Sequence, residues 1–265
     1  MMAIAVTIAG SDSGGGAGIQ ADLKTFSALG VYGASVIAAL TAQNTLGVTA
    51  IHDVPAEFVT AQIDAVFSDL AVNAVKIGML SNPAVILAVA AGLDRYAQAK
   101  VALDPVMVAT SGDVLLREEA IETLVRELFP RAAVVTPNLR EAARILNGPS
   151  AESEADMERQ AEAILDLGAK AVLIKGGHAG GAQSSDYLLS PQGGRWFRSP
   201  RIDTQNTHGT GCTLSAAIAA GLARGLDLES AVAAAKDYLT RAIEASGRLQ
   251  IGHGHGPVHH FHEWW

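Results

Sequence analysis

The only cysteine in the chain follows a glycine-rich turn, at the start of a segment predicted to be helical. The turn is His208-Gly209-Thr210-Gly211, and the Ala-rich segment runs from Cys212 to Leu222. Glycine lets the backbone approach a ligand closely, and the free amides of a helix N-terminus attract phosphate. A thiol in a first helical turn typically has a lowered pKa. The stretch therefore predicts an anion hole that contains its own proton acceptor. The alternative is a glycine-rich turn beside a buried, inert thiol.

Polar side chains also follow several apolar runs that predict buried strands. Each has an ordinary structural explanation on its own, such as a helix cap, a turn or a solvated strand end. Because ligands bind beyond the carboxyl ends of parallel strands, their recurrence after strand upon strand predicts one active site. These residues are Ser11 and Asp12, Gln43 and Asn44, Asp104, Asn138 with Glu141, and Lys175.

Two carboxylates in this set could bind a metal ion. Asp104 and Glu141 are oxygen ligands of the kind that hold Mg²⁺, partly through water, while phosphates complete the shell. Helix capping and surface charge are the alternative for both. Lys175 could place a positive charge on a nucleotide phosphate. The Gly14–Gly18 run fits a dinucleotide-binding motif only loosely, because Gln43 stands where an acidic residue would hold the ribose. It is not a P-loop either, because Leu23 occupies a position where a P-loop needs glycine. We interpret that run as a flap against which substrate lies.

Strands and helices alternate along the chain, and they must position these side chains. Nearly all-apolar runs predict buried strands at 3–9, 36–41, 74–77, 100–103, 133–136 and 171–174. Helical spacing predicts helices at about 19–29, 55–70, from 81–83, 117–128, 139–146, 154–167, 212–224 and 228–246. Residues 47–52 predict an extra strand or a flap, and 190–194 predict the turn of a hairpin. The order predicts a three-layer α/β/α fold, with a mostly parallel sheet and an antiparallel edge hairpin. No linker or repeat interrupts it, so we expect one domain over residues 1–265.

Composition limits the classes of partner. The chain has 265 residues, of which 49% are hydrophobic and 17% charged, and this predicts a compact globule. Its net charge of −8 disfavours nucleic acid as a partner. The single cysteine fits a reducing cytoplasm, and no signal peptide or run long enough to cross a membrane is found. We therefore expect a cytoplasmic protein without a nucleic-acid or membrane partner. The histidines after residue 250 match no closed metal-ligand set and stay unassigned.

The sequence resembles the hydroxymethylpyrimidine/phosphomethylpyrimidine kinases of thiamin biosynthesis, in the ribokinase-like superfamily. The likeness runs nearly end to end, and most of the superfamily has aspartate where this chain has Cys212. The pyrimidine kinases and some pyridoxal kinases have the cysteine. This chain departs from the pattern at Arg140, where proline is common, and in a small polar loop at Gly180–Ser185. The motifs that carry the likeness are Ala9–Asp22, Thr41–Thr45, Lys76–Leu80, Leu103–Val106, Thr136–Leu139 with Glu141, Lys175–His178 and His208–Ser215.

The resemblance implies a ribokinase-like fold and a kinase that uses ATP and Mg²⁺. Such an enzyme phosphorylates the hydroxymethyl group of 4-amino-5-hydroxymethyl-2-methylpyrimidine and then the resulting monophosphate, and the fold commonly forms a homodimer. By matching motif, Gln43 would hydrogen-bond the aminopyrimidine, with Asp22, Gly10, Met79 and Val106 around it. The nucleotide would be bound by Asp104, Asn138, Glu141, Lys175 and Thr207, with Asp104 and Glu141 on Mg²⁺. Gly209, Thr210, Gly211 and Cys212 would form the anion hole, and Cys212 would accept the proton.

Two other functions are compatible with the same motifs. A pyridoxal kinase uses the same fold and cysteine, and its acceptor is also a small heterocycle with a hydroxymethyl arm. Gln43 favours the pyrimidine, because an amide pairs both donor and acceptor atoms of an aminopyrimidine edge. A non-catalytic protein that senses the pyrimidine belongs to a different class. The intact set of Asp104, Glu141, Lys175 and Cys212 argues against it.

Overall fold

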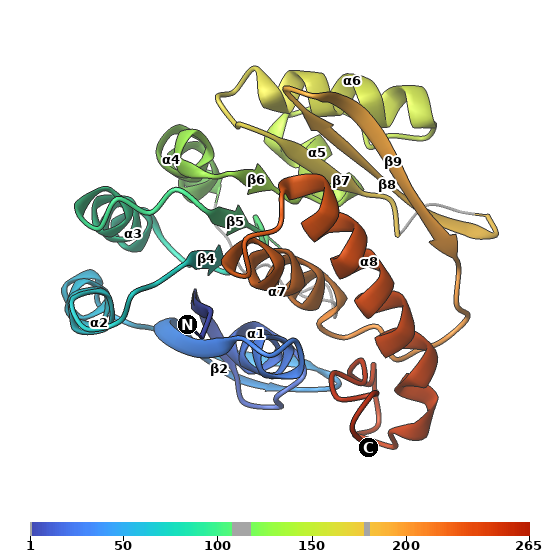
Figure 1. The fold of residues 1–265 in the computed structure, drawn as a ribbon, viewed down its shortest axis with the longest axis horizontal. Helices are drawn as coiled ribbons and strands as arrows, with labels where there is room; N and C mark the ends of the chain where they lie inside the picture. The colour runs from blue at the N-terminus through green and yellow to red at the C-terminus, as the bar shows by residue number, and fades with distance from the viewer. Residues whose placement is uncertain (1, 108–117, 178–180) are drawn as a thin grey trace.

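The computed structural model describes residues 2–107, 118–177 and 181–265, so His178 and Gly180 of the motifs above lie outside it. Within these ranges, nine strands form one sheet between two layers of helices (Figure 1). The predicted three-layer α/β/α fold is confirmed. The strands are β1 (Ile4–Asp12), β2 (Tyr32–Asn44), β3 (Gly47–Asp53), β4 (Ala74–Ile77), β5 (Val101–Leu103), β6 (Val134–Val135), β7 (Val172–Lys175), β8 (Gln183–Ser190) and β9 (Gly193–Pro200). The helices are α1 (Gly18–Ala28), α2 (Ala56–Phe67), α3 (Pro83–Arg95), α4 (Glu118–Leu128), α5 (Leu139–Ile145), α6 (Glu154–Leu165), α7 (Thr210–Ala223) and α8 (Leu228–Glu244).

The sheet is parallel in its centre and antiparallel at both edges. Its order is β3-β2-β1-β4-β5-β6-β7-β8-β9, and the pairs from β2 to β7 are all parallel. The β8–β9 hairpin forms one edge, as predicted. Residues 47–53, for which a strand or a flap was expected, form β3, which pairs antiparallel with β2 at the other edge. The chain order reverses between β1 and β4, and such a reversal is where open α/β sheets bind ligands.

Two strands are longer than their apolar runs predict. β1 continues through Ser11 and Asp12, and β2 continues through Gln43 and Asn44, so these residues lie in strand ends and not in loops. Backbone pairing explains the difference. The end of β2 pairs with β3 on one side and with β1 on the other, and this pairing does not require apolar side chains. Its register with β3 shifts between Ala42 and Gln43.

Helices cover both faces of the sheet and create two separate cores. α2, α3, α4 and α6 pack on one face, and α1, α7 and α8 pack on the other (Figure 1). Helix α7 is buried from Thr213 to Ala223, and its small side chains allow α8 to approach closely. A Cβ at Gly221 would lie 2.9 Å from the Cβ of Ala231. In the part of the chain that the structure describes, no helix is long and apolar enough to cross a membrane.

Helix boundaries follow their capping residues. Asn82 caps α3 by accepting a hydrogen bond from the Val85 amide at 3.1 Å, so this helix begins where the sequence predicted. Helix α7 begins at Thr210, two residues earlier than predicted, with Gly209 as its N-cap. Cys212 is therefore the third helical residue. This shift keeps the thiol in the first turn, beside amides that have no intrahelical acceptor.

Candidate active site

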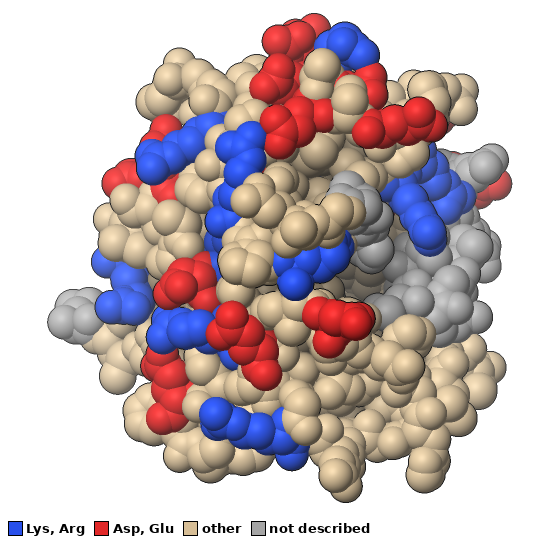
Figure 2. All heavy atoms as spheres, turned by 90° about the vertical axis from the view of Figure 1, so that its right-hand side faces the viewer, with Lys and Arg blue, Asp and Glu red and all other residues tan. Residues whose placement is uncertain are grey.

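A cavity of about 500 Å³ lies at the carboxyl ends of the strands. Figure 2 faces the side to which the arrows of β4, β5 and β6 point in Figure 1, and both basic and acidic side chains lie around the middle of that view. Asp22 and Asn44 are the predicted site residues that are not part of the cavity wall. The predicted residues that line the cavity are Gly10, Ser11, Asp12, Gln43, Met79, Asp104, Val106, Asn138, Glu141, Lys175, Thr207, Gly209, Thr210, Gly211 and Cys212.

The turn before α7 has the geometry of an anion hole. Gly209 has φ = +79°, and a Cβ there would lie 1.9 Å from the carbonyl oxygen of Gly16. Any larger residue would be strained and would collide with the glycine-rich flap. A Cβ at Gly211 would lie 3.3 Å from Lys175 Nζ and 3.4 Å from an Asp104 carboxylate oxygen. The first amides of α7 are therefore adjacent to the charged side chains of the site.

Three charged side chains from different elements meet beside this turn, since Lys175 ends β7, Asp104 follows β5 and Glu141 lies in α5. Lys175 Nζ lies 2.7 Å from Asp104 Oδ1 and 3.9 Å from Glu141 Oε2. Burial by itself would lower the pKa of Lys175, but the carboxylates of Asp104 and Glu141 hold it above its usual value. Burial raises the pKa of Glu141 to about 7, although Lys175 opposes the shift. The cluster pairs a buried lysine with two carboxylates at the place where phosphates are expected.

Glu141 has the helix-capping role that the sequence offered as the alternative, and it also lines the cavity. Its Oε2 accepts a hydrogen bond from the Asn138 amide at 2.8 Å, and Asn138 Oδ1 accepts one from the Glu141 amide at 2.9 Å. This capping box starts α5 and also holds Glu141 against the cavity. Among the described residues, no group of three or more His, Cys, Asp or Glu side chains is arranged as a metal site. The two carboxylates still fit Mg²⁺, which is commonly bound by one or two carboxylates together with substrate phosphates.

The thiol of Cys212 differs from the sequence-based expectation. Enclosure by the protein raises the pKa of Cys212 to about 11, while the charge of Lys76 acts in the opposite direction. The predicted fall toward neutrality is therefore wrong for the ligand-free site. Lys76 is a fully buried lysine in β4, and its Nζ lies 2.8 Å from Asp22 Oδ2. Asp22 lies behind the cavity wall and also accepts a hydrogen bond from the Thr7 hydroxyl at 2.6 Å.

Lys76 was not assigned a role from the sequence, although a signal was present. It is the one charged residue in the otherwise apolar run of β4. A lysine in a strand with both faces buried needs a carboxylate partner, and Asp22 is that partner. The pair stabilises a positive charge near the thiol. The charge of Lys76 is the main influence that opposes the effect of burial on the pKa of Cys212, whereas the charge of Asp22 adds to that effect.

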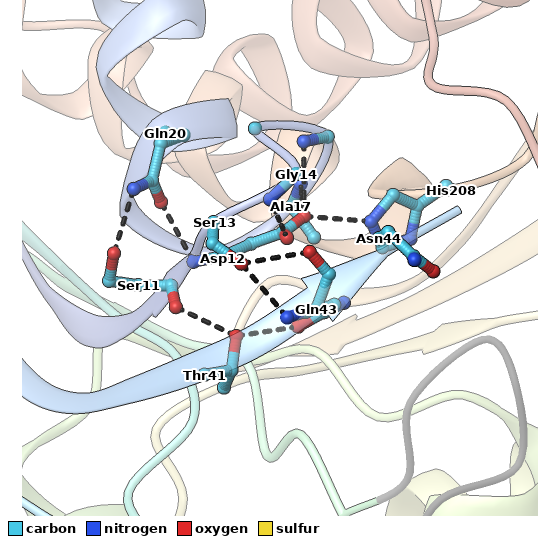
Figure 3. Close-up of polar contacts among 12 residues, drawn as sticks. Ser11, Asp12, Ser13, Gly14, Ala17, Gln20, Thr41, Gln43, Asn44 and His208 are labelled. Atoms are coloured by element: carbon cyan, nitrogen blue, oxygen red, sulfur yellow. Dashed lines mark hydrogen bonds and ion pairs between the residues drawn. The ribbon is translucent and has the colours of Figure 1, made fainter. Parts of the chain in front are cut away.

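Asp12 connects the glycine flap to the anion hole (Figure 3). Its Oδ1 accepts a hydrogen bond from the amide of Gly14 at 2.8 Å. Its Oδ2 accepts bonds from the amides of Gly16 at 3.0 Å and Ala17 at 2.8 Å, and from His208 Nε2 at 2.8 Å. Burial by itself would raise the pKa of Asp12, but the bonds from His208 and Ala17 hold it below its usual value. Because an ionised carboxylate only accepts, His208 donates from Nε2. The residue before Gly209 is thus anchored to the flap.

Gln43 lies in the wall of the cavity and is held by Ser13, which follows β1, and by Thr41 of β2 (Figure 3). The Ser13 hydroxyl donates to the backbone carbonyl of Gln43 and accepts from its amide, both at 2.8 Å. The Thr41 hydroxyl contacts the side-chain amide of Gln43 at 3.0 Å. Gly10 and Met79 line the cavity as well, and a Cβ at Gly10 would lie 3.1 Å from Met79 Sδ. These contacts fix both the backbone and the side chain of Gln43.

A second buried pair supports the loop after β7. Lys236 Nζ on α8 lies 2.7 Å from Asp186 Oδ2, and Asp186 Oδ1 accepts a hydrogen bond from the Gly176 amide at 2.9 Å. Both charged side chains also line the cavity. Sequence reasoning missed this pair, because Lys236 belongs to an amphipathic helix whose lysines are ordinarily solvated. Asp186 lies opposite Lys175 in the β7–β8 pair and bonds the Gly176 amide, so the ion pair holds the backbone that carries Lys175.

Comparison with known proteins gives a consistent result. The family model described as phosphomethylpyrimidine kinase matches residues 12–259. A hydroxymethylpyrimidine/phosphomethylpyrimidine kinase of Rhizobium meliloti (strain 1021) is 64% identical, with 100% of this chain and 99% of that protein covered. The crystal structure of phosphomethylpyrimidine kinase from Clostridium difficile 630 has a TM-score of 0.80 at 46% identity, covering 91% of this chain and 99% of that one. Pyridoxal kinase from Staphylococcus aureus, in complex with AMP-PCP and pyridoxal, has a TM-score of 0.91 at 31% identity, covering 100% and 95%.

Proposed function

The chain belongs to the phosphomethylpyrimidine kinase family, and we propose that it phosphorylates its acceptor twice at the expense of ATP. The first acceptor is 4-amino-5-hydroxymethyl-2-methylpyrimidine, and the second is its monophosphate. The product is the pyrimidine diphosphate used in thiamin biosynthesis. The observation that supports this most is a single cavity that brings Gln43, Lys175 and Cys212 together. In this proposal Gln43 binds the pyrimidine ring, Lys175 binds the phosphates of ATP, and Cys212 lies where the phosphoryl group is transferred.

Transfer of a phosphoryl group needs positioning, charge neutralisation and a place for the acceptor's proton. In our proposal the amides from Gly209 to Cys212 face the γ-phosphoryl oxygens, and Lys175 contacts the phosphates of ATP. Cys212 takes the proton of the hydroxymethyl group as the hydroxymethyl oxygen bonds to the γ-phosphorus, and the bond between that phosphorus and ADP breaks. The second acceptor is a phosphate oxygen, which is already largely deprotonated because its second pKa is about 6. The two transfers therefore need different help from Cys212.

We propose that Asp104 and Glu141 hold Mg²⁺ together with the phosphates, with Asn138 and Thr207 beside them. When bound, the ion neutralises charge on the transferring phosphoryl group. The donor set supports this assignment, since both carboxylates line the cavity and one of them adjoins the anion-hole turn. Lys175 lies against the same carboxylates and would keep their mutual repulsion low before the nucleotide binds.

We also propose a homodimer and a cytoplasmic location. The homodimer rests on the frequency of dimers among ribokinase-like kinases, and size-exclusion chromatography with light scattering tests it. The location rests on the single cysteine, which suits a reducing compartment.

The decisive experiment measures ADP release from ATP with three acceptors: the aminopyrimidine, its monophosphate and pyridoxal. Turnover with the first two, together with the expected phosphorylated products, supports the proposal. A higher kcat/KM for pyridoxal would favour the second candidate, a pyridoxal kinase, for which the structural similarity to the Staphylococcus aureus enzyme is the specific support. Binding of the aminopyrimidine without any turnover would favour a sensor.

A further inference from the structure

The hydroxyl of Thr41 lies between two oxygen atoms, although it carries only one hydrogen. Its Oγ1 is 2.9 Å from the backbone carbonyl oxygen of Ser11 and 3.0 Å from Oε1 of Gln43 (Figure 3). One hydroxyl hydrogen cannot be donated to both acceptors. A half-turn of the Gln43 amide exchanges Oε1 and Nε2 with little change in shape. Nε2 then donates to Thr41, and Thr41 donates to Ser11. This arrangement satisfies both contacts and gains one hydrogen bond.

From these hydrogen bonds we propose that Thr41 determines acceptor specificity, because it holds the side chain of Gln43 with the amide oxygen of Gln43 toward the cavity. The inference deepens the proposed function and rests on it. Thr41 is a positioning residue, because its hydroxyl contacts the Gln43 amide and it acts through that side chain. Its side chain is only 8% exposed, so water competes little for its hydroxyl. The hydroxyl and the amide lie 3.0 Å apart, although the register of β2 with β3 shifts between Ala42 and Gln43.

The orientation of the amide decides which heterocycle edge fits. A carbonyl oxygen accepts hydrogen bonds, and the amino group beside the hydroxymethyl arm of the aminopyrimidine donates them. The ring nitrogen next to that amino group is an acceptor, and Nε2 of Gln43 still has a second hydrogen to donate. Pyridoxal carries an aldehyde oxygen and a phenolic oxygen at the two corresponding positions. With the phenol ionised, both are acceptors, and the Gln43 carbonyl oxygen is left without a donor.

A site built to bond a particular donor discriminates strongly against an analogue that lacks it. We therefore expect the wild-type enzyme to prefer the aminopyrimidine over pyridoxal by about 100-fold or more in kcat/KM. We also expect a loss of about 30-fold or more for 5-hydroxymethyl-2-methylpyrimidine, which lacks only the amino group. Without the Thr41 hydroxyl, the amide can turn in either direction, and both preferences should fall by about 10-fold.

The test compares Thr41→Val, which replaces the hydroxyl by a methyl group of similar size, with Thr41→Ser, which keeps the hydroxyl. We measure kcat and KM for the aminopyrimidine, its deamino analogue and pyridoxal at saturating ATP. Thr41→Val should raise KM for the aminopyrimidine and leave KM for ATP unchanged, while Thr41→Ser stays within about twofold of wild type. In a Gln43→Leu background, Thr41→Val should have no further effect on selectivity, because the residue through which it acts is absent.

Several outcomes would overturn the inference. One is a Thr41→Val enzyme whose selectivity among the three acceptors equals that of wild type. Another is a wild-type enzyme that does not distinguish the aminopyrimidine from its deamino analogue, a measurement that requires no variant to fold. Thr41→Ala serves as a second hydroxyl deletion if the valine variant is unstable. A wild-type enzyme that prefers pyridoxal contradicts the proposed function as well. One that prefers the aminopyrimidine, with unchanged selectivity in Thr41→Val, contradicts this inference alone.

Discussion

Replacing Cys212 by alanine should separate the two phosphorylations, because only the first acceptor has a proton to lose. The pKa of the thiol is raised to about 11 by enclosure, so at pH 7 about one molecule in 10⁴ holds the thiolate. A thiolate base therefore predicts that kcat/KM for the hydroxymethyl acceptor rises about 10-fold per pH unit between pH 7 and 9. The rate rises with pH because the raised pKa of Cys212 lies above this range, so the thiolate fraction of the free enzyme keeps growing as the pH increases.

The phosphate acceptor should behave differently. Its second pKa is about 6, so its rate should be nearly independent of pH above pH 7. Loss of a general base typically slows a reaction by about 10²–10⁴-fold. We therefore expect Cys212→Ala to slow the first transfer by at least about 100-fold and to abolish its pH slope. The second transfer should change by less than about fivefold.

The assay is coupled ADP release with each acceptor from pH 6.5 to 9, for wild type, Cys212→Ala and Cys212→Ser. Serine preserves the approximate size of the side chain but is a much weaker acid, so it controls for packing. Equal losses in both transfers, or a first transfer that does not depend on pH in the wild type, would refute the proton-acceptor role. Cys212 would then be a packing element of the anion hole.

Three other perturbations test the site and its supports. Gly209→Ala should lower kcat by about 10²-fold or more, because its Cβ would lie 1.9 Å from a carbonyl oxygen at φ = +79°. Gly225→Ala, at φ = +89° with no atom within 4 Å, should cost only about 1–2 kcal/mol of stability and leave the rate unchanged. Burial lowers the pKa of His260 to about 3, so only the unfolded chain gains its proton as pH falls below 6.5. Urea unfolding should show about 2 kcal/mol of stability lost from pH 6.5 to 5. A His260→Gln variant that lost stability to the same extent would show that His260 is not its source. Lys236→Met should destabilise the protein by about 3–5 kcal/mol and raise KM for ATP, because it leaves Asp186 buried without its partner. The double variant Lys236→Met/Asp186→Asn should recover part of the stability and part of the KM. A Lys236→Met variant with wild-type stability would contradict a buried ion pair.

Much of the fold follows from local patterns. The apolar runs predict the central strands, and helical spacing predicts the helices between them, because burial in a layered fold imposes a period that the sequence displays. The antiparallel β3 edge and the long ends of β1 and β2 depend on backbone pairing between strands, which side-chain polarity does not report. Gln43 is therefore a strand residue, and so is its partner Thr41.

The sequence also predicts one site, since polar residues at strand ends and a cysteine at a helix start indicate one edge of a parallel sheet, and most of these residues line one cavity there. Only the tertiary structure decided the electrostatics of that edge. Asp12 and His208 are 196 positions apart in the chain, and Lys76 lies 54 positions from Asp22, yet each pair is in contact. Helix position alone predicts a lowered pKa for Cys212, whereas enclosure raises it to about 11. The physical reason is that a pKa depends on burial and on distances to charges remote in the sequence, and the fold sets both.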